Sequence, residues 1–397
     1  MSRDYNGLVL ADIHIGAIPV SQTYKEINFL RKYLVNKYFS FIIIAGDLFD
    51  KKLYSGEDYI VIANQLILLL MSKCDKLRVI EGTSSHDNNQ YSIFKQYEET
   101  SIHKILQKNI DFKIIESVQE EMLFPDLEVL YIPEEYIYDK KEYYRNFFNT
   151  EDKYDYVFGH GIIQEAMSNA VKNTNKSKEH RKKAPVFSTF ELEKICKGKV
   201  YFGHYHVNTN IHDKVFYVGS YSRDKFGEEE PKGFYELSCN DNKYSEKFIE
   251  NTITENYLTI SFPYNHKIFN PDVDLIKEFD NIKNKKKESG VEHLRLIFNI
   301  PDEYPNPEFF INIVNDTFKN THEYKLDIVN GYIKTKKNIN KQKFREIRDK
   351  FNYIFDENSN IEDNISGYSR DKLNREISPE KVNKYLNFKA IDILKME

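Results

Sequence analysis

Seven short apolar runs in the first 240 residues constrain the fold of this chain more than any other feature. They are rich in Val, Ile, Phe and Tyr, and most are followed at once by Gly, Asp or Pro, which is typical of buried β-strands. Apolar residues also recur at helical spacing over residues 27–38, and the apolar stretch 59–71 is long enough for a buried helix. The pattern predicts a layered α/β domain with strands inside and helices outside. The seven runs cover residues 8–11, 41–45, 77–80, 129–132, 156–158, 200–202 and 215–218.

At 397 residues the chain is too long for a single core, and its pattern changes after about residue 255. Residues 293–300 and 324–333 predict strands on either side of a helix over residues 307–318, which indicates a small α/β module. Two amphipathic helices are predicted further on, over residues 341–355 and 379–394. We therefore expect three parts: an α/β domain over residues 1–250, a smaller α/β capping domain over residues 251–336 and a helical tail over residues 337–397.

Charge limits the partners of the chain without deciding between them. The net charge of −5 argues mildly against binding to nucleic acid. Basic residues nevertheless gather in residues 172–183, 283–287 and 334–350. A solvated face or a flexible loop is the ordinary explanation of such a run, and DNA binding is the alternative. Lys182 and Lys183, which end the first run, are candidate DNA contacts.

Nothing in the sequence indicates a membrane protein or an exported one. The chain has no apolar run of about eighteen residues, the length that a spanning helix needs. Asp4 and Asn6 lie where a signal peptide would need its apolar stretch. The three cysteines are scattered and predict buried thiols in a reducing cytoplasm. Abundant Lys, Asn and Ile with no Trp suggest the cytoplasm of a bacterium or of a phage-infected cell.

Five short motifs follow the apolar runs, at the carboxyl ends of predicted strands, where open α/β sheets build their sites. Each motif alone is a weak signal, because a histidine after a strand is as easily structural and Gly-Asp usually marks a turn. The five together, each after an apolar run, predict a metal site. In chain order they are Asp12-Ile13-His14, Gly46-Asp47, Ser85-His86-Asp87, Gly159-His160 and Gly203-His204-Tyr205-His206.

The residue types suit a centre with two metal ions. Asp12 and His14 lie two residues apart just past a strand, so both side chains can point toward the same metal ion. A carboxylate such as Asp47 can bridge two cations. Mixed carboxylate and imidazole ligands suit Mn, Fe or Zn, and the oxygen ligands favour Mn²⁺. Two such ions about 3.5–4 Å apart can activate a water and stabilise an in-line displacement at phosphorus.

The order of the motifs resembles the calcineurin-like metallophosphoesterases, whose pattern runs DxH, GD, GNHD, GH and GHxH. The resemblance implies an α/β/β/α-type sandwich with two divalent metal ions. His86 matches the catalytic histidine of that family, and Asp87 would orient it. Ser85 stands where the family has a metal-binding Asn, so we expect the second metal to bind more weakly than the first. The metal ligands carried over are Asp12, His14, Asp47 and His206 for one ion, and Asp47, His160 and His204 for the other.

Residues 215–236 narrow the resemblance to the SbcD-type nucleases, in which a strand, GS, Arg, FGE and KGF follow GHxH. A hairpin with an acidic turn would explain the strands but not the ordered match. Membership implies a Mn²⁺-dependent DNA nuclease of recombination, repair or replication, with 3′-to-5′ exonuclease action on duplex ends and endonuclease action on hairpins. Arg223 is then a candidate DNA contact. The matching residues are Tyr217, Gly219, Ser220, Arg223, Phe226, Gly227, Glu228, Lys232, Gly233 and Phe234.

The same resemblance implies partners. DNA is the expected substrate, an SbcC-type ATPase is the expected partner subunit, and a homodimer is compatible with the family. The chain has no GxxxxGK[ST] segment, so any dependence on ATP must come from another subunit.

Two alternatives remain open. A phosphatase or a small-molecule phosphodiesterase could use the same scaffold, although it would not need the partly basic residues 251–397. An interaction scaffold without metal would not need to keep His86 and the other four motif histidines.

Overall fold

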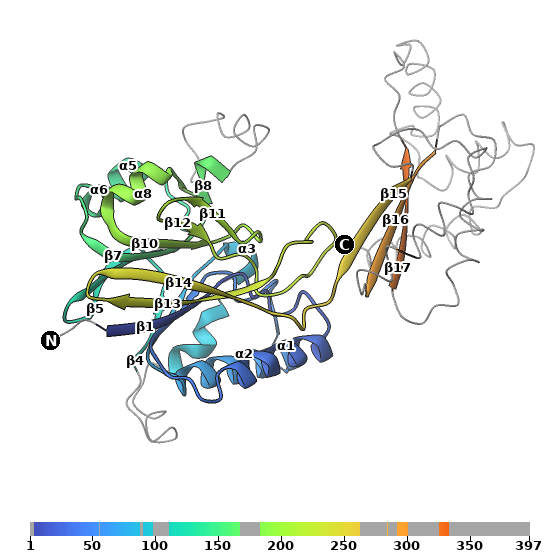
Figure 1. Cartoon of the computed structure of the whole chain (residues 1–397), viewed down its shortest axis with the longest axis horizontal. Helices are drawn as coiled ribbons and strands as arrows, with labels where there is room; N and C mark the ends of the chain where they lie inside the picture. The colour runs from blue at the N-terminus through green and yellow to red at the C-terminus, as the bar shows by residue number, and fades with distance from the viewer. Residues whose placement is uncertain are drawn as a thin grey trace, which may run out of the picture. The chain divides into compact units, whose positions relative to one another are not determined.

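The computed structural model describes residues 4–54, 56–87, 90–97, 111–166, 183–262, 284, 292–300 and 325–332 (Figure 1). The chain divides into two compact units, residues 1–299 with 305–331 and residues 300–304 with 332–397. Nearly all described residues belong to the first unit. The boundaries expected after residues 250 and 336 stay predictions. The helices expected over residues 307–318, 341–355 and 379–394 lie outside the described residues.

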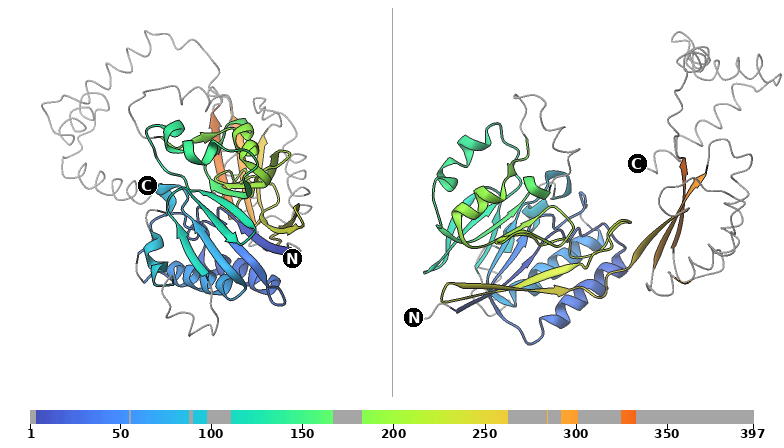
Figure 2. Two further views of the ribbon diagram at one scale, coloured as in Figure 1. Left: turned by 90° about the vertical axis from the view of Figure 1, so that its left-hand side faces the viewer. Right: turned by 45° about the horizontal axis from the view of Figure 1, so that its top comes forward.

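The first sheet contains six strands in the order β14-β13-β1-β2-β3-β4. The run from β1 to β4 is parallel, and β13 and β14 extend it in antiparallel fashion. Helices α1 and α2 cover one face, where Ile27 and Leu30 pack with Leu8 and Ile42 (Figures 1 and 2). The elements are β1 (Asp4–Leu10), α1 (Val20–Tyr33), β2 (Phe39–Ala45), α2 (Asp58–Met71), β3 (Cys74–Ile80), β4 (Asp111–Ile115), β13 (Gly233–Asn240) and β14 (Lys243–Glu250).

The second sheet also contains six strands, in the order β11-β12-β10-β7-β6-β5. Its four central strands are parallel, and β11 and β5 are antiparallel at the two edges. Residues of α6, α8 and the adjacent loops pack on its outer face. The elements are β5 (Gln119–Phe124), β6 (Leu127–Ile132), α5 (Lys140–Tyr143), α6 (Arg145–Phe148), β7 (Tyr154–His160), α8 (Thr189–Ile195), β10 (Cys196–Gly203), β11 (Thr209–His212) and β12 (Val215–Tyr217).

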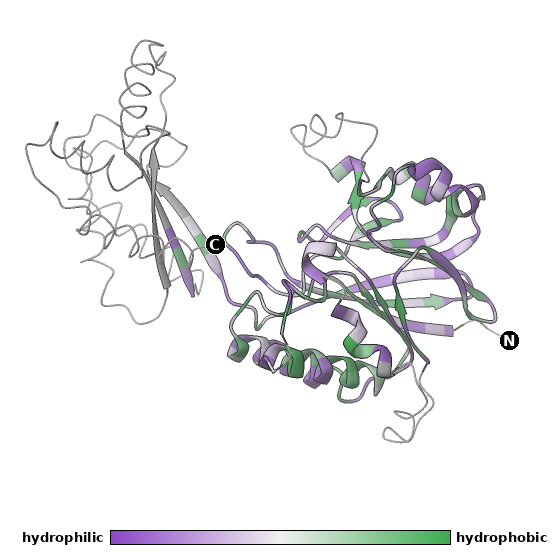
Figure 3. Ribbon diagram, turned by 180° about the vertical axis from the view of Figure 1, so that it is seen from behind, coloured by the Kyte–Doolittle hydropathy of each residue, from purple (hydrophilic) through white to green (hydrophobic). Residues whose placement is uncertain are grey.

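A core between the two sheets joins them face to face. Alternate residues of a strand point to opposite faces, so Leu8 packs toward the helices while Val9 packs toward the second sheet. Phe41 from β2 meets Tyr156 and Phe158 from β7 in this inner core. Figure 3 shows α1 with hydrophilic and hydrophobic residues interleaved, as expected of a helix with one buried face. The expected mixed α/β class is confirmed, and each of the seven apolar runs contributes to a buried strand.

Smaller elements complete the described part. Strands β15 (Tyr257–Phe262), β16 (His293–Ile300) and β17 (Lys325–Tyr332) form a three-stranded sheet, which includes the two strands expected near residues 293–300 and 324–333. A two-stranded sheet joins β8 (Ile162–Ile163) and β9 (Val186–Phe187), and the short helices are α3 (Ser84–Asp87), η1 (Gln90–Tyr97) and η2 (Gln164–Ala166). No helix in the described ranges is long and apolar enough to cross a bilayer.

Candidate metal centre

Four strands deliver the motif residues to one place. Asp12 and Asp47 each lie two residues beyond the ends of β1 and β2 in the first sheet. His160 ends β7 and His204 follows β10 directly, both in the second sheet. The Asp12 amide donates to the Gly46 carbonyl at 3.2 Å, which ties the loops after β1 and β2 together.

The backbone of the site is strained where the motifs lie. Asp12, His14, Asp47 and His204 all have positive φ, and they make up four of the seven such non-glycine residues in the described part of the chain. Positive φ is unfavourable for a side chain with a Cβ and gathers at functional sites, where the surrounding structure enforces it. The strain therefore points to the same residues as the sequence motifs.

The first cluster consists of Asp12, His14 and His206, whose ligand atoms lie within 4.8 Å of one another. The Nε2 atoms of His14 and His206 are 3.0 Å apart. Ligand atoms bound at about 2.1 Å to one ion lie about 3.0–3.4 Å apart, depending on the coordination angle. Burial lowers the pKa of His14 to about 3, so the imidazole is neutral, the form that binds a metal. This cluster fits one divalent ion.

His206 is oriented by an acid behind it. Glu228 accepts a hydrogen bond from Nδ1 of His206 at 2.5 Å, which leaves Nε2 to face His14. Lys232 is fully buried and donates from Nζ to the His206 carbonyl at 2.8 Å. A carboxylate behind a ligating imidazole is the usual support of a metal site.

The second cluster consists of Glu134, His160 and His204. Glu134 Oε2 lies 3.1 Å from His204 Nδ1 and 3.7 Å from His160 Nε2. Nδ1 of His160 is engaged with the Ala45 carbonyl at 2.9 Å, so Nε2 is the nitrogen that faces the cluster. These spacings also suit ligands of a single ion.

Asp47 lies between the two clusters. Its Oδ2 is 3.9 Å from His14 Nε2, and its Oδ1 is 3.3 Å from His160 Nε2. Burial alone would raise the pKa of Asp47, but His160 holds that pKa well below its usual range. Asp47 is therefore ionised, with one oxygen toward each cluster.

Two glycines allow this close approach. A Cβ on Gly46, whose φ is +82°, would lie 2.2 Å from His160 Nδ1. A Cβ on Gly203 would lie 2.3 Å from the Ala45 carbonyl oxygen. Both distances are far inside van der Waals contact, so a larger residue at either position would push His160 off the end of β2.

His86 lies beside the first cluster, as its motif predicts, but Asp87 does not orient it. The His86 and His14 rings are 4.9 Å apart, and His86 Nδ1 is 2.7 Å from the Asp50 carbonyl oxygen. The expectation that Asp87 holds His86 is therefore corrected, since a backbone carbonyl does so.

Asp87 instead connects the loop that contains Phe49 to the loop that contains Gly82. It is fully buried and accepts hydrogen bonds from the Phe49 and Gly82 amides, at 3.1 and 2.7 Å, and from the Tyr91 hydroxyl at 2.6 Å. Burial, with the nearby Asp47, raises the pKa of Asp87 to about 7. Its part in the site is to position the loops.

Ser85 does not reach either cluster. Its side chain is exposed on α3, and among the described residues it has no hydrogen bond to a cluster side chain. Thr83 points inward instead, with Oγ1 at 3.0 Å from Glu134 Oε2 and 3.4 Å from His160 Nε2. The structure thus gives no support to Ser85 as a metal ligand.

The three candidate DNA contacts lie in different surroundings. Arg223 is almost wholly buried, and its guanidinium donates to Asn256 Oδ1 and to the carbonyls of Glu229 and Glu230. Because these acceptors occupy it inside the protein, Arg223 is corrected to a structural residue. Lys183 is exposed and its backbone pairs with Ile137, while Lys182 lies outside the described residues.

Sequence reasoning missed Glu134 as a site residue and gave Glu228 no role. Glu134 follows the run 129–132 by two residues, the same offset that Asp47 has from the run 41–45, and this signal could have found it. Glu228 belongs to the FGE segment, but nothing in the segment shows that its partner is His206.

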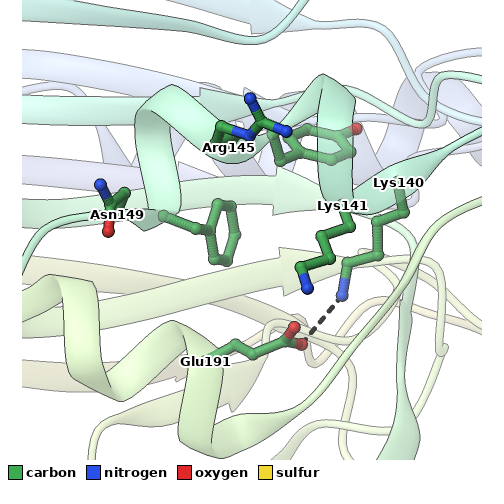
Figure 4. A pocket seen from close by; sticks show the side chains of 7 residues that line it. Lys140, Lys141, Arg145, Asn149 and Glu191 are labelled. Carbon is green, nitrogen blue, oxygen red and sulfur yellow. Dashed lines mark hydrogen bonds and ion pairs between the residues drawn. The ribbon is translucent and has the colours of Figure 1, made fainter.

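A basic pocket of about 360 Å³ shares no residue with the clusters. Figure 4 shows Lys140 and Lys141 reaching toward Glu191, and Lys140 Nζ contacts Glu191 Oε2 at 2.8 Å. The acid already neutralises part of the charge, so we assign the pocket no part in the metal centre. Its lining residues are Lys140, Lys141, Tyr144, Arg145, Phe148, Asn149 and Glu191.

Comparison with known proteins adds no further constraint. No protein-family model matches the chain, and no curated protein is similar enough to count as a match.

The bracing role of Asp87 predicts a stability defect. Asp87→Ala leaves the buried Phe49 and Gly82 amides without acceptors, which costs about 1–3 kcal/mol each, so the free energy of unfolding should fall by about 2–6 kcal/mol. His86→Ala removes one partly buried hydrogen bond and should cost only about 1 kcal/mol. Denaturant unfolding in a metal chelator measures both. Equal losses in the two variants would contradict the bracing role.

Proposed function

We propose that this chain is a two-metal phosphodiesterase that cuts DNA, an SbcD-type member of the calcineurin-like metallophosphoesterases. The observation that carries the proposal is Asp47, with one oxygen toward each of two clusters of carboxylate and imidazole groups. Two strands of each sheet supply these groups in the order of the family motifs. The four-layer packing, with helices outside two facing sheets, agrees with the proposed family fold.

Each protein group has a separate task in this reaction. Two divalent ions, Mn²⁺ by preference, would supply an activated water and offset the charge that develops on the phosphate. Asp12, His14, Asp47 and His206 would hold one of them, and Asp47, His160 and His204 the other. His86 keeps Nδ1 on the Asp50 carbonyl, so Nε2 is the nitrogen able to give a proton to the leaving oxygen.

The segment 215–236 supports the nuclease assignment through its match to the SbcD-type block. Three contacts explain why residues of this block would be needed near the metal centre. Glu228 accepts from the His206 ring, and Lys232 and the Ser220 amide both donate to the His206 carbonyl. These contacts serve metal binding, so the choice of DNA as substrate rests on the resemblance and on the basic runs. Residues 172–182 and 334–350 of those runs lie outside the described residues.

An SbcC-type ATPase remains the proposed partner subunit. Helices over residues 341–355 and 379–394 would dock on it through apolar faces that include Phe344, Ile347 and Phe351. Both helices lie outside the described residues, so this part of the proposal rests on sequence alone.

The proposed function predicts Mn²⁺-dependent cleavage of linear duplex DNA by the isolated chain. The measurement compares release of nucleotides from end-labelled duplex with hydrolysis of a small aryl phosphate. Asp47→Ala is the control and should abolish cleavage, because two cations would then face each other without a shared carboxylate. Hydrolysis of the aryl phosphate without any DNA cleavage would favour the phosphatase alternative.

His86→Ala should separate catalysis from binding. The turnover number should fall by about 10²–10⁴-fold, the usual contribution of a general acid, while Mn²⁺ and DNA affinities stay unchanged. Calorimetric titration with Mn²⁺ and single-turnover kinetics measure the two effects. Loss of a bound ion in this variant would make His86 a metal ligand and would contradict the role assigned to it.

A further inference from the structure

Glu134 is a buried carboxylate for which the family motifs provide no role. It follows Pro133 at the end of β6, and its side chain is 2% exposed. Its carboxylate lies next to His160, His204, the Thr83 hydroxyl and the Tyr136 hydroxyl. A carboxylate as deeply buried as this is costly unless positive charge faces it.

The position of the Glu134 Oε2 atom shows whether Glu134 can bind the metal itself or only support a histidine that does. A supporting carboxylate lies behind its histidine, on the nitrogen turned away from the metal, as Glu228 does at His206. Glu134 Oε2 instead lies 3.7 Å from Nε2 of His160, and the other nitrogen of that ring is already engaged with Ala45. Oε2 is therefore on the side of His160 that also faces Asp47 Oδ1 at 3.3 Å.

We propose that Glu134 is a ligand of the second metal ion, in place of the neutral amide that the metallophosphoesterase pattern puts there. This inference rests on the proposed function. Oε2 lies 3.1 Å from His204 Nδ1, which is the spacing of neighbouring ligands around one ion of about 2.1 Å bond length. Thr83 donates from Oγ1 to Oε2 at 3.0 Å and fixes the carboxylate.

The assignment changes the charge of the second site. Asp47 and Glu134 would give the second ion two carboxylates and two imidazoles. The first ion has the same donor set from Asp12, Asp47 and two histidines. The two sites should then hold Mn²⁺ with comparable affinity, which replaces the weaker second site expected from a serine ligand. A carboxylate in place of an amide also favours hard ions such as Mn²⁺.

Calorimetric titration of the metal-stripped full chain tests this directly. The wild type and Glu135→Gln should each bind two Mn²⁺ ions. Glu135 is the matched control, because it is the adjacent carboxylate but contacts the Val118 amide and the Tyr143 hydroxyl. Glu134→Gln should lower the Mn²⁺ affinity of one site by at least about tenfold and leave the other unchanged.

Titration with Zn²⁺ separates a ligand from a support of His204. Loss of a carboxylate ligand should weaken Mn²⁺ more than Zn²⁺, because imidazole already suits Zn²⁺. Equal losses for both ions, or no loss for either, would overturn the proposal while leaving two metals and the nuclease assignment in place. A wild type that binds no Mn²⁺ would overturn both.

A second variant guards against a folding defect. Thermal unfolding in chelator shows whether Glu134→Gln is folded. Glu134→Asp keeps the charge but withdraws the oxygen by one methylene, so it should weaken Mn²⁺ at the same single site. Undiminished binding of two ions by Glu134→Asp would count against the proposal.

Discussion

The Asp47 carboxylate is the group on which the rest of the site depends. It comes from the first sheet, yet its closest imidazole, His160, comes from the second, so it joins the carboxyl ends of both sheets. The Thr83 amide donates to Asp47 Oδ1 at 2.6 Å and attaches the loop that carries His86 to the same carboxylate. Two sheets and one loop therefore converge on a single side chain.

The packing around Asp47 accounts for features that look unrelated along the chain. Gly46 and Gly203 leave room for His160 to lie against the end of β2, and a Cβ at either position would collide with it or with Ala45. The backbone turns sharply after the strands at four residues with positive φ, so that their side chains can approach the same site. These residues are Asp12, His14, Asp47 and His204. Such strain persists because the two-sheet core fixes where each strand ends.

Sequence reasoning predicted the buried framework and the convergence of the motifs, because continuous apolar runs and the residues after them are local signals. Strands such as β4, β5, β11, β14 and β15 were not predicted. In β14, exposed and half-buried residues largely alternate, and no apolar run marks the strand. The motif pattern places Ser85 directly before His86, but Ser85 lies in the helical turn α3 with its side chain exposed, and Thr83, which precedes α3, faces the cluster instead. Asp87 and Arg223 carry charges that suggest chemistry, and only the three-dimensional contacts show that backbone groups occupy them.

The two-metal centre is tested most directly by a crystal structure of the wild-type chain with Mn²⁺, with the ions located by their anomalous scattering. A two-metal centre should give two peaks, one in contact with Asp12, His14 and His206 and the other with His160 and His204, with Asp47 bonded to both. A single ion, two ions that do not share Asp47, or no ion at saturating Mn²⁺ would contradict the two-metal centre.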